Sequence, residues 1–304
     1  MNMNMPQAIL AAIASAVIAL PAGAEILIED DVGREIRLAE PARRIVSLAP
    51  HVTELLFAAG AGDRIVGVVA YSNYPEAATQ ITHVGSYNNV DLEAIATLAP
   101  DLIVAWQSGN PEAHLDKLEA LGIPVFFNEP RSLGDVADSV EALGRIAGTE
   151  AVASAAASAF RARHADLEAR FGGRAKVRMF YQIWDQPLMT VNDKHLISDV
   201  IRLCGGENVF ATLSALAPRI GVESVLAADP EAIVASGMGA SRPEWLDQWR
   251  RWPELAANRH DNLFFVHPDL IQRHTPRILD GAEQVCGFLE RARERRQPAP
   301  PGGR

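Results

Sequence analysis

Positive charge is scarce in this 304-residue chain, in which 28 Lys and Arg residues are outnumbered by 38 Asp and Glu residues. The formal net charge of −10 argues against a nucleic-acid partner, because binding to phosphates needs a basic face. The same acidity disfavours docking on anionic lipid, and we expect no direct insertion into a membrane. Hydrophobic residues make up 48% of the chain, which is ordinary for a packed protein and argues against a disordered one.

Catalytic motifs are also missing. The sequence contains no G-x-S-x-G, H-E-x-x-H, G-x-x-x-x-G-K-[ST] or G-x-G-x-x-G pattern, so neither a catalytic nucleophile nor a phosphate loop is indicated. Cys and His residues do not occur at the paired spacings that zinc sites need. We therefore expect no enzymatic activity, no metal site and no cofactor. An enzyme or a metal-cluster protein of similar architecture is the alternative from another functional class.

Charge is absent altogether from residues 1–24. Residues 9–20 form an apolar stretch that is too short to cross a bilayer comfortably. The small residues 22–24 then precede Glu25, as at the cleavage site of a secretory signal peptide, although no Lys or Arg stands before the apolar stretch. The pattern predicts export to a periplasm of the Gram-negative type, without a lipid anchor because no cysteine stands at the cleavage point. A buried apolar helix is the alternative.

Cysteine is rare, with only Cys204 and Cys286 present. An even number of cysteines suits an oxidising compartment, where these two residues would form one disulfide. Two buried free thiols are the alternative.

Short β-branched runs alternate with Ala- and Leu-rich helical stretches along most of the chain. Each run is mostly apolar and three to five residues long, as in buried parallel strands. The runs are residues 45–48, 65–68, 102–105, 125–127, 177–181, 232–235 and 263–266. This alternation predicts an α/β fold in which helices cover both faces of parallel sheets.

Residues 132–171 interrupt the alternation. The segment from Ser132 to Arg170 has no proline, and apolar residues such as Val136 and Val140 keep the spacing of one helix face. It predicts one long helix over residues 132–171, or two helices that meet near Gly148.

The two halves of the chain share a sequence echo. Residues 92–105 align without a gap with residues 222–235, and each segment has Glu in its second position, then a proline, then an apolar run. The echo predicts two similar lobes that face each other across the long helix, with a ligand in the cleft between them. Chance recurrence of a common helix–proline–strand unit is the alternative.

The predicted boundaries follow from these features. We expect a signal peptide at residues 1–24, an N-terminal lobe at 25–131, the connecting helix at 132–171 and a C-terminal lobe at 172–290. The remaining residues, 291–304, are rich in Arg, Pro and Gly, and we expect them to be a flexible tail.

Aromatic residues follow several of the predicted strands. Ligands of open α/β sheets sit at the carboxyl ends of strands, and Tyr and Trp combine a flat face with a polar tip. The set therefore suits a large, partly polar ring ligand, although simple packing is the alternative for any single member. Its members are Tyr71, Tyr87, Trp106 and Trp184.

Two motifs, RIVSLAP at residues 44–50 and TELLFAAG at 53–60, resemble the opening of the helical-backbone (class III) periplasmic substrate-binding proteins. These proteins serve ABC importers of cobalamin, haem and iron chelates. The resemblance covers nearly the whole chain after residue 24. It is closest to the cobalamin-binding members at residues 71–75, 100–110, 204–208 and 276–278.

The resemblance implies two Rossmann-like α/β lobes joined by a single long α-helix. It also implies a monomer that captures cobalamin or a related corrinoid and delivers it to the permease of an ABC transporter. A haem or iron–siderophore binding protein of the same fold is the alternative.

Roles for individual residues follow from the same resemblance. Those that match the corrinoid pocket are Tyr71, Tyr87, Trp106, Asp269 and Arg273. Glu93 and Glu223 match two carboxylates at the lobe tips that form salt bridges with Arg residues of the permease. Cys204 and Cys286 match a disulfide.

Several positions of this pocket differ from the family pattern or add to it. Tyr87 stands where the family can carry Trp, and Met189 and Ala217 stand where it can carry Phe and Trp. We therefore expect a less aromatic second wall of the pocket, which Trp184 and Met189 would form, and which also suits a smaller ligand. His51 follows Pro50 at a strand end, where its imidazole would reach the cobalt or iron of a ligand; a capping or surface role is the alternative.

Overall fold

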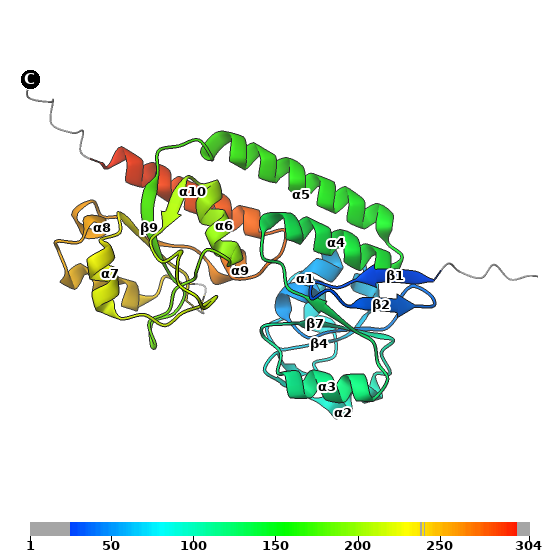
Figure 1. Ribbon diagram of the computed structural model, residues 1–304. Coiled ribbons are helices and arrows are strands. Elements are labelled where there is room, and N and C mark those ends of the chain that lie inside the picture. Colours follow the sequence, from blue (N-terminus) through cyan, green and yellow to red (C-terminus); the bar gives the residue numbers. More distant parts are fainter. Residues whose placement is uncertain (1–24, 238, 240, 297–304) are drawn as a thin grey trace, which may run out of the picture.

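A computed structural model describes residues 25–237, 239 and 241–296, so the predicted signal peptide lies outside the described residues. Two separate four-stranded parallel sheets form the centres of two lobes (Figure 1). The fold class predicted from the alternating runs is therefore confirmed. The predicted tail is partly wrong, because residues 291–294 continue the last helix, α10 (Ile278–Glu294), whereas residues 297–304 are outside the described range.

The N-terminal lobe is built on a parallel sheet in the order β4-β3-β7-β8. Its strands are β3 (Ile45–Ser47), β4 (Ile65–Val68), β7 (Leu102–Trp106) and β8 (Val125–Asn128). Its helices are α1 (Pro50–Ala58), α2 (Leu92–Thr97) and α3 (Glu112–Ala120). Buried residues pack on both faces of this sheet, which explains why unbroken runs of Val, Ile, Leu and Phe predict its strands correctly.

Small elements that the sequence patterns did not indicate complete this lobe. Two antiparallel pairs lie outside the main sheet: β1 (Ile26–Glu29) with β2 (Glu35–Leu38), and β5 (Gly85–Ser86) with β6 (Asn89–Val90). Single 3₁₀ turns occur at Gly62–Arg64 and Glu76–Gln80.

The C-terminal lobe repeats the plan with a parallel sheet in the order β10-β9-β11-β12. Its strands are β9 (Val177–Gln182), β10 (Gly206–Asn208), β11 (Ala232–Ala235) and β12 (Leu263–Phe265). Its shorter helices are α6 (Leu196–Leu203), α7 (Val222–Ala228), α8 (Ala256–Arg259) and α9 (Pro268–Ile271), with a 3₁₀ segment at Glu244–Arg251.

The sequence echo corresponds to a structural one. Residues 92–105 form α2 and β7, and residues 222–235 form α7 and β11. The chain leaves both helices through a residue in the left-handed conformation, Ala99 with φ 43° and Asp229 with φ 40°. A non-glycine residue with positive φ is uncommon, so the shared turn is strong support for two lobes built on one plan.

The connecting segment is two helices, α4 (Leu133–Ala147) and α5 (Glu150–Phe171). A single helix over residues 132–171 is therefore wrong, and the alternative of two helices that meet near Gly148 is confirmed. Gly148 ends α4 in the left-handed conformation, with φ 65°, and the chain turns back so that α5 packs along α4. The packing is close, since a side chain at Gly144 would meet the Cβ atom of Ala153 at 2.2 Å.

Helix α5 then runs from the N-terminal lobe to the C-terminal lobe, where α10 packs against it (Figure 1). A continuous cluster of buried residues includes Val104 of the first sheet, Leu143 of α4, Phe160 of α5 and Tyr181 of the second sheet. The two lobes therefore share one apolar core through these helices.

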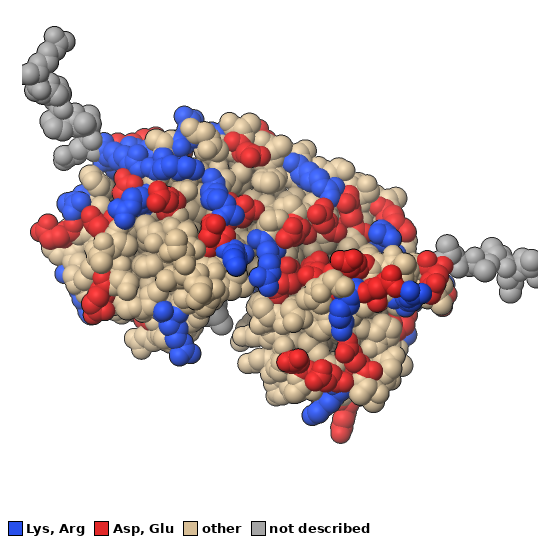
Figure 2. All heavy atoms as spheres, viewed as in Figure 1, with Lys and Arg blue, Asp and Glu red and all other residues tan. Residues whose placement is uncertain are grey.

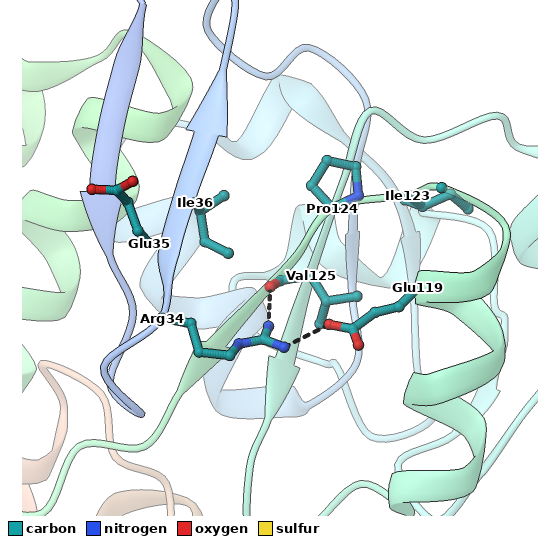
Figure 3. Close-up of a pocket in the computed structure, with 8 residues that line it drawn as sticks. Arg34, Glu35, Ile36, Glu119, Ile123, Pro124 and Val125 are labelled. Carbon is teal, nitrogen blue, oxygen red and sulfur yellow. Dashed lines mark hydrogen bonds and ion pairs between the residues drawn. The ribbon is translucent and has the colours of Figure 1, made fainter.

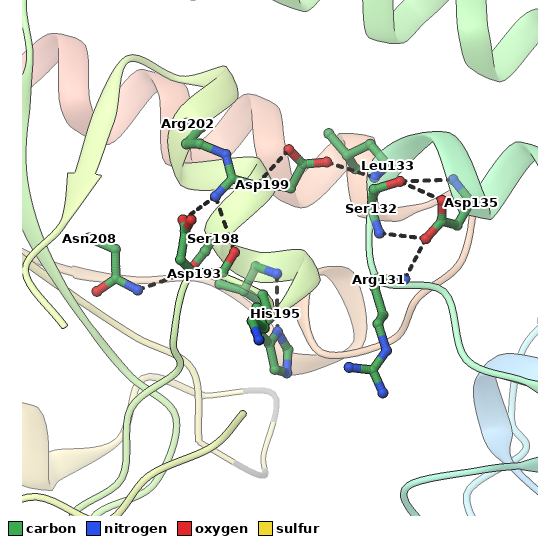
Figure 4. Close-up of polar contacts among 12 residues, drawn as sticks. Arg131, Ser132, Leu133, Asp135, Asp193, His195, Ser198, Asp199, Arg202 and Asn208 are labelled. Atoms are coloured by element: carbon green, nitrogen blue, oxygen red, sulfur yellow. Dashed lines mark hydrogen bonds and ion pairs between the residues drawn. The ribbon is translucent and has the colours of Figure 1, made fainter. Parts of the chain in front are cut away.

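Polar contacts also join the start of α4 to the C-terminal lobe (Figure 4). Ser132 and Asp135 form a reciprocal capping box at the start of α4. The free N–H of Leu133 donates to Asp199 Oδ2 of α6 at 2.8 Å, so a carboxylate of one lobe caps a helix of the other.

The predicted disulfide is present between Cys204 and Cys286. It joins the end of α6 to the middle of α10, and both residues are fully buried. In the described part of the chain, no helix has the length and the apolar character needed to span a membrane.

Candidate ligand-binding cleft

An aromatic group stands where the strands of the N-terminal sheet end. Trp106 is the last residue of β7, and its ring lies 5.8 Å from that of Tyr87 and 5.3 Å from that of His51, measured between ring centroids. The ring of His51 meets Trp106 edge-on. The structure thus brings together three of the residues that the sequence proposed for one pocket.

Tyr71 is the most exposed large hydrophobic residue of this region, with 70% of its surface accessible. Its backbone has φ 68°, which is strained for a bulky residue and is often found at functional sites. Folding alone gives no reason to expose so large a ring, so Tyr71 is suited to contact with a ligand.

Asn110 holds the aromatic group in place, a role that sequence reasoning missed. Its side-chain oxygen accepts from Trp106 N at 2.7 Å, and its amide nitrogen donates to the carbonyl groups of Leu48 at 2.9 Å and Tyr87 at 2.7 Å. A single buried amide therefore ties the ends of two strands to the loop of Tyr87. The GN pair at residues 109–110 was the only signal for it.

Asp269 and Arg273 lie in the C-terminal lobe, in and after α9. They form an ion pair of 2.9 Å with each other. Arg273 also reaches the N-terminal lobe, where it donates to Tyr71 O at 3.2 Å. The structure thus places Arg273 at the Tyr71 loop, with Asp269 bound to it; their contact with a ligand stays a prediction.

Trp184 and Met189 lie on a short antiparallel turn after β9. Met189 N donates to Trp184 O at 3.1 Å, and Met189 also pairs with Arg219. Trp184 is 37% exposed, and its indole N–H donates to Gln186 O at 3.0 Å. The contacts of this second wall are within the C-terminal lobe, and none joins it to the aromatic group of the first wall among the described residues.

His51 is buried rather than exposed, with 6% of its surface accessible. This burial does not favour direct ligation of a metal in the cleft. Instead, His51 belongs to a row of three histidines that crosses from one lobe to the other, in which His51 and His274 are buried and His195 is half-buried. The rings of His51 and His274 are 5.9 Å apart, and those of His274 and His195 are 5.5 Å apart.

Burial keeps these histidines neutral. Desolvation lowers the pKa of His195 to about 3, with a further contribution from neighbouring His274. Desolvation also lowers the pKa of His274 to about 4, although the carbonyl of Pro130 opposes this effect. The pKa of His51 lies well below its ordinary value, because of burial and the nearby His274 and Arg273.

Glu93 and Glu223 lie in the first turns of α2 and α7, on separate lobes, and both are exposed. In Figure 1, α2 and α7 occupy outer parts of the two lobes, away from the connecting helix α5. The two carboxylates are thus equivalent in sequence and in place, as the sequence echo predicted.

The surface is hollowed between the two lobes (Figure 2). A further pocket of the N-terminal lobe lies between β2, α3 and β8 (Figure 3). Its one cation, Arg34, is already bonded to Asp30, Glu119 and the carbonyl of Val125, so it offers no free charge to a ligand. Among the described residues, no three or more His, Cys, Asp or Glu side chains are placed so that they could hold a metal ion together.

Known proteins resemble the chain in sequence and in structure. The vitamin B12-binding protein of Vibrio cholerae is 39% identical over 255 residues, which cover 84% of this chain and 91% of that protein. The crystal structure of the periplasmic vitamin B12 binding protein BtuF of Vibrio cholerae superposes with a TM-score of 0.77 and 39% identity, covering 84% of this chain and 99% of that one.

A periplasmic heme binding protein from Pseudomonas aeruginosa shares the fold at 23% identity and a TM-score of 0.70, covering 81% of this chain and 92% of that one. The family model described as periplasmic binding protein matches residues 45–270. This match includes both sheets and the helices between them. The chain therefore belongs to the periplasmic binding protein family.

Proposed function

We propose that this protein captures cobalamin or a related corrinoid in the periplasm and delivers it to the permease of an ABC transporter. The observations that carry the proposal are the Tyr87–Trp106 ring pair at the end of β7 and the exposed ring of Tyr71, whose backbone carbonyl accepts from Arg273 of the Asp269–Arg273 pair. A corrin is a large ring with polar amide side chains. Flat aromatic faces would contact the ring, and the carboxylate of Asp269 would accept hydrogen bonds from the amides.

Binding is non-covalent in this proposal. The protein carries out no reaction, and its selectivity comes from the shape and the polarity of the cleft. The relatives that match most of the chain are vitamin B12-binding proteins by name, which supports a binding role over an enzymatic one. The shared core of α4 and α5 would limit closure of the lobes to small movements.

Delivery would use Glu93 and Glu223. Each carboxylate stands on an exposed first turn, one on each lobe, so the pair suits two basic groups of one membrane partner. We propose that the exported protein works as a monomer that docks through both lobes at once.

Haem or a ferric siderophore is the second candidate ligand. The exposed phenol of Tyr71 favours it, because phenolate oxygen is a ligand that ferric iron accepts. The limited aromatic character of the second wall is compatible with either ligand.

Titration calorimetry with cyanocobalamin, haemin and a ferric hydroxamate separates these candidates. We expect heat with cyanocobalamin, and a rise in Kd of at least about tenfold for Trp106→Ala because a stacking face is lost. Trp252→Ala is the matched control, since Trp252 packs on Trp249 in the C-terminal lobe. No heat with cyanocobalamin and a clear signal with a ferric ligand would replace the first candidate by the second.

A further inference from the structure

Glu54 is a buried carboxylate that the proposed ligand site does not use. It lies on α1 of the N-terminal lobe, and only 3% of its surface is accessible. A buried carboxylate is costly unless cations and hydrogen bonds compensate its charge. The cations that compensate its charge therefore show which parts of the chain Glu54 holds together.

Both compensating cations come from the other lobe. Glu54 Oε1 accepts from Arg273 Nη1 at 2.8 Å and from Arg277 Nη2 at 2.6 Å, and Oε2 accepts from Arg277 Nε at 2.9 Å. Arg277 thus binds the carboxylate with two parallel hydrogen bonds, the strongest arrangement for such a pair. In the sequence, Arg273 lies 219 positions and Arg277 lies 223 positions after Glu54.

The same two arginines hold the loop that presents Tyr71. Arg273 donates to Asn73 Oδ1 at 2.8 Å and to the carbonyl of Tyr71, and the guanidinium carbon of Arg277 stands 3.8 Å from the ring centroid of Tyr74. Each hydrogen bond orients the loop from the opposite side of the cleft. Arg273 therefore has few donors left for a ligand.

Charge is balanced within this group. Two carboxylates, Glu54 and Asp269, meet two guanidinium groups, Arg273 and Arg277. We call these four residues the interlobe ion cluster. Three of them are at most about one fifth exposed in their side chains, so water and salt screen them only weakly.

We propose that Glu54 is the positioning residue of the cleft: through the interlobe ion cluster it fixes the separation of the lobes and the place of the Tyr71 loop. It acts on the ligand through Arg273 and the loop and does not touch it. The effect on ligand affinity rests on the proposed function. The separation of the lobes is measurable without any ligand.

The test is Glu54→Gln. The amide keeps the size of the side chain, but one of its two acceptors becomes a donor that opposes a guanidinium group. We expect the Kd for cyanocobalamin to rise by at least about tenfold. Arg277→Lys is the second variant; it keeps the charge and loses the paired hydrogen bonds, and we expect the same direction.

Glu231→Gln is the matched control. Glu231 also binds one arginine, Arg296, through Nε at 2.8 Å and Nη2 at 2.9 Å, but within the C-terminal lobe. We expect it to lower the melting temperature and to leave the Kd within about twofold of wild type. An equal rise in Kd for Glu231→Gln, or an unchanged Kd for a folded Glu54→Gln, would overturn the inference.

The ligand-free readout uses spin labels at Lys117→Cys and Glu254→Cys, one on each lobe. We expect Glu54→Gln to broaden the distance distribution between the labels, and Glu231→Gln to leave it unchanged. If wild type does not bind cyanocobalamin, the proposed ligand is wrong, and this distance still decides the inference. An unchanged distribution in Glu54→Gln would overturn it.

Discussion

Arg44 and Arg178 hold equivalent positions in the two lobes. The guanidinium group of Arg44 donates to the carbonyl groups of Leu98 and Ala99 at the end of α2, and that of Arg178 donates to the carbonyl groups at the end of α7. These are the two helices that carry Glu93 and Glu223. Both candidate docking helices are thus fixed at their carboxyl ends by an arginine of the neighbouring strand segment.

The first prediction concerns these arginines. We expect Arg44→Gln and Arg178→Gln each to lower the free energy of unfolding by about 1 kcal/mol, because a cation that bonds the last carbonyls of a helix is lost. Urea denaturation measures the change. Arg43→Gln is the control, since its side chain makes only an exposed 3.7 Å ion pair with Glu40. A similar loss in that control would contradict the assigned role.

The second prediction concerns delivery. We expect the double variant Glu93→Ala with Glu223→Ala to bind cyanocobalamin as wild type does and to abolish its uptake into cells that lack the native gene. The matched control is Glu112→Ala with Glu244→Ala, which removes two acidic residues from other first turns. Loss of ligand binding in the first double variant, or equal loss of uptake in the control, would count against docking.

The third prediction concerns pH. The pKa of His274 is about 4 in the folded protein and 6.5 in the unfolded chain, so the unfolded state binds more protons between these values. The free energy of unfolding should therefore fall as the pH is lowered from 6.5 towards 4, by up to about 3 kcal/mol from this residue. His195 contributes in the same direction.

Urea denaturation at a series of pH values measures this slope in wild type and in His274→Gln. The difference between the two proteins isolates the imidazole from the carboxylates that titrate in the same range. We expect a shallower slope for the variant. Identical slopes would show that His274 does not titrate as its burial predicts.

The fourth prediction concerns the disulfide. Cys204 and Cys286 are 82 residues apart, and closing a loop of this length restricts the unfolded chain by about 4.5 kcal/mol in the chain-entropy model. We expect the variant with Ser at both positions to lose stability of this order in urea denaturation. Wild type treated with a reductant should match it, and a gap between the two would point to an effect of the serines themselves.

The strands were predictable because they are buried on both faces. Runs such as residues 102–105 carry only apolar residues, and each predicted strand of the N-terminal sheet lies within two residues of the observed one. The bend at Gly148 was open to two interpretations. Helix-forming residues continue on both sides, and the left-handed Gly148, which ends α4, lets α5 turn back and pack along it.

The polar half of the site was not predictable in the same way. Glu54 reads as an ordinary helical residue, since neither of its partners lies near it in the sequence. His51 suggested a contact with the ligand because it follows a strand, yet its ring is buried between Trp106 of its own lobe and His274 of the other lobe. Long-range pairs of polar groups leave no local period in a sequence, whereas buried strands and helix faces do.

The position of α10 gives the disulfide a meaning beyond stability. This helix starts directly after Arg277, which binds Glu54 across the cleft, and it carries Cys286. The covalent bond to Cys204 thus anchors the same helix whose N-cap residue, Arg277, binds the opposite lobe. A copy of the protein that remained reduced would keep its two sheets but lose the covalent bond that anchors α10 to the end of α6.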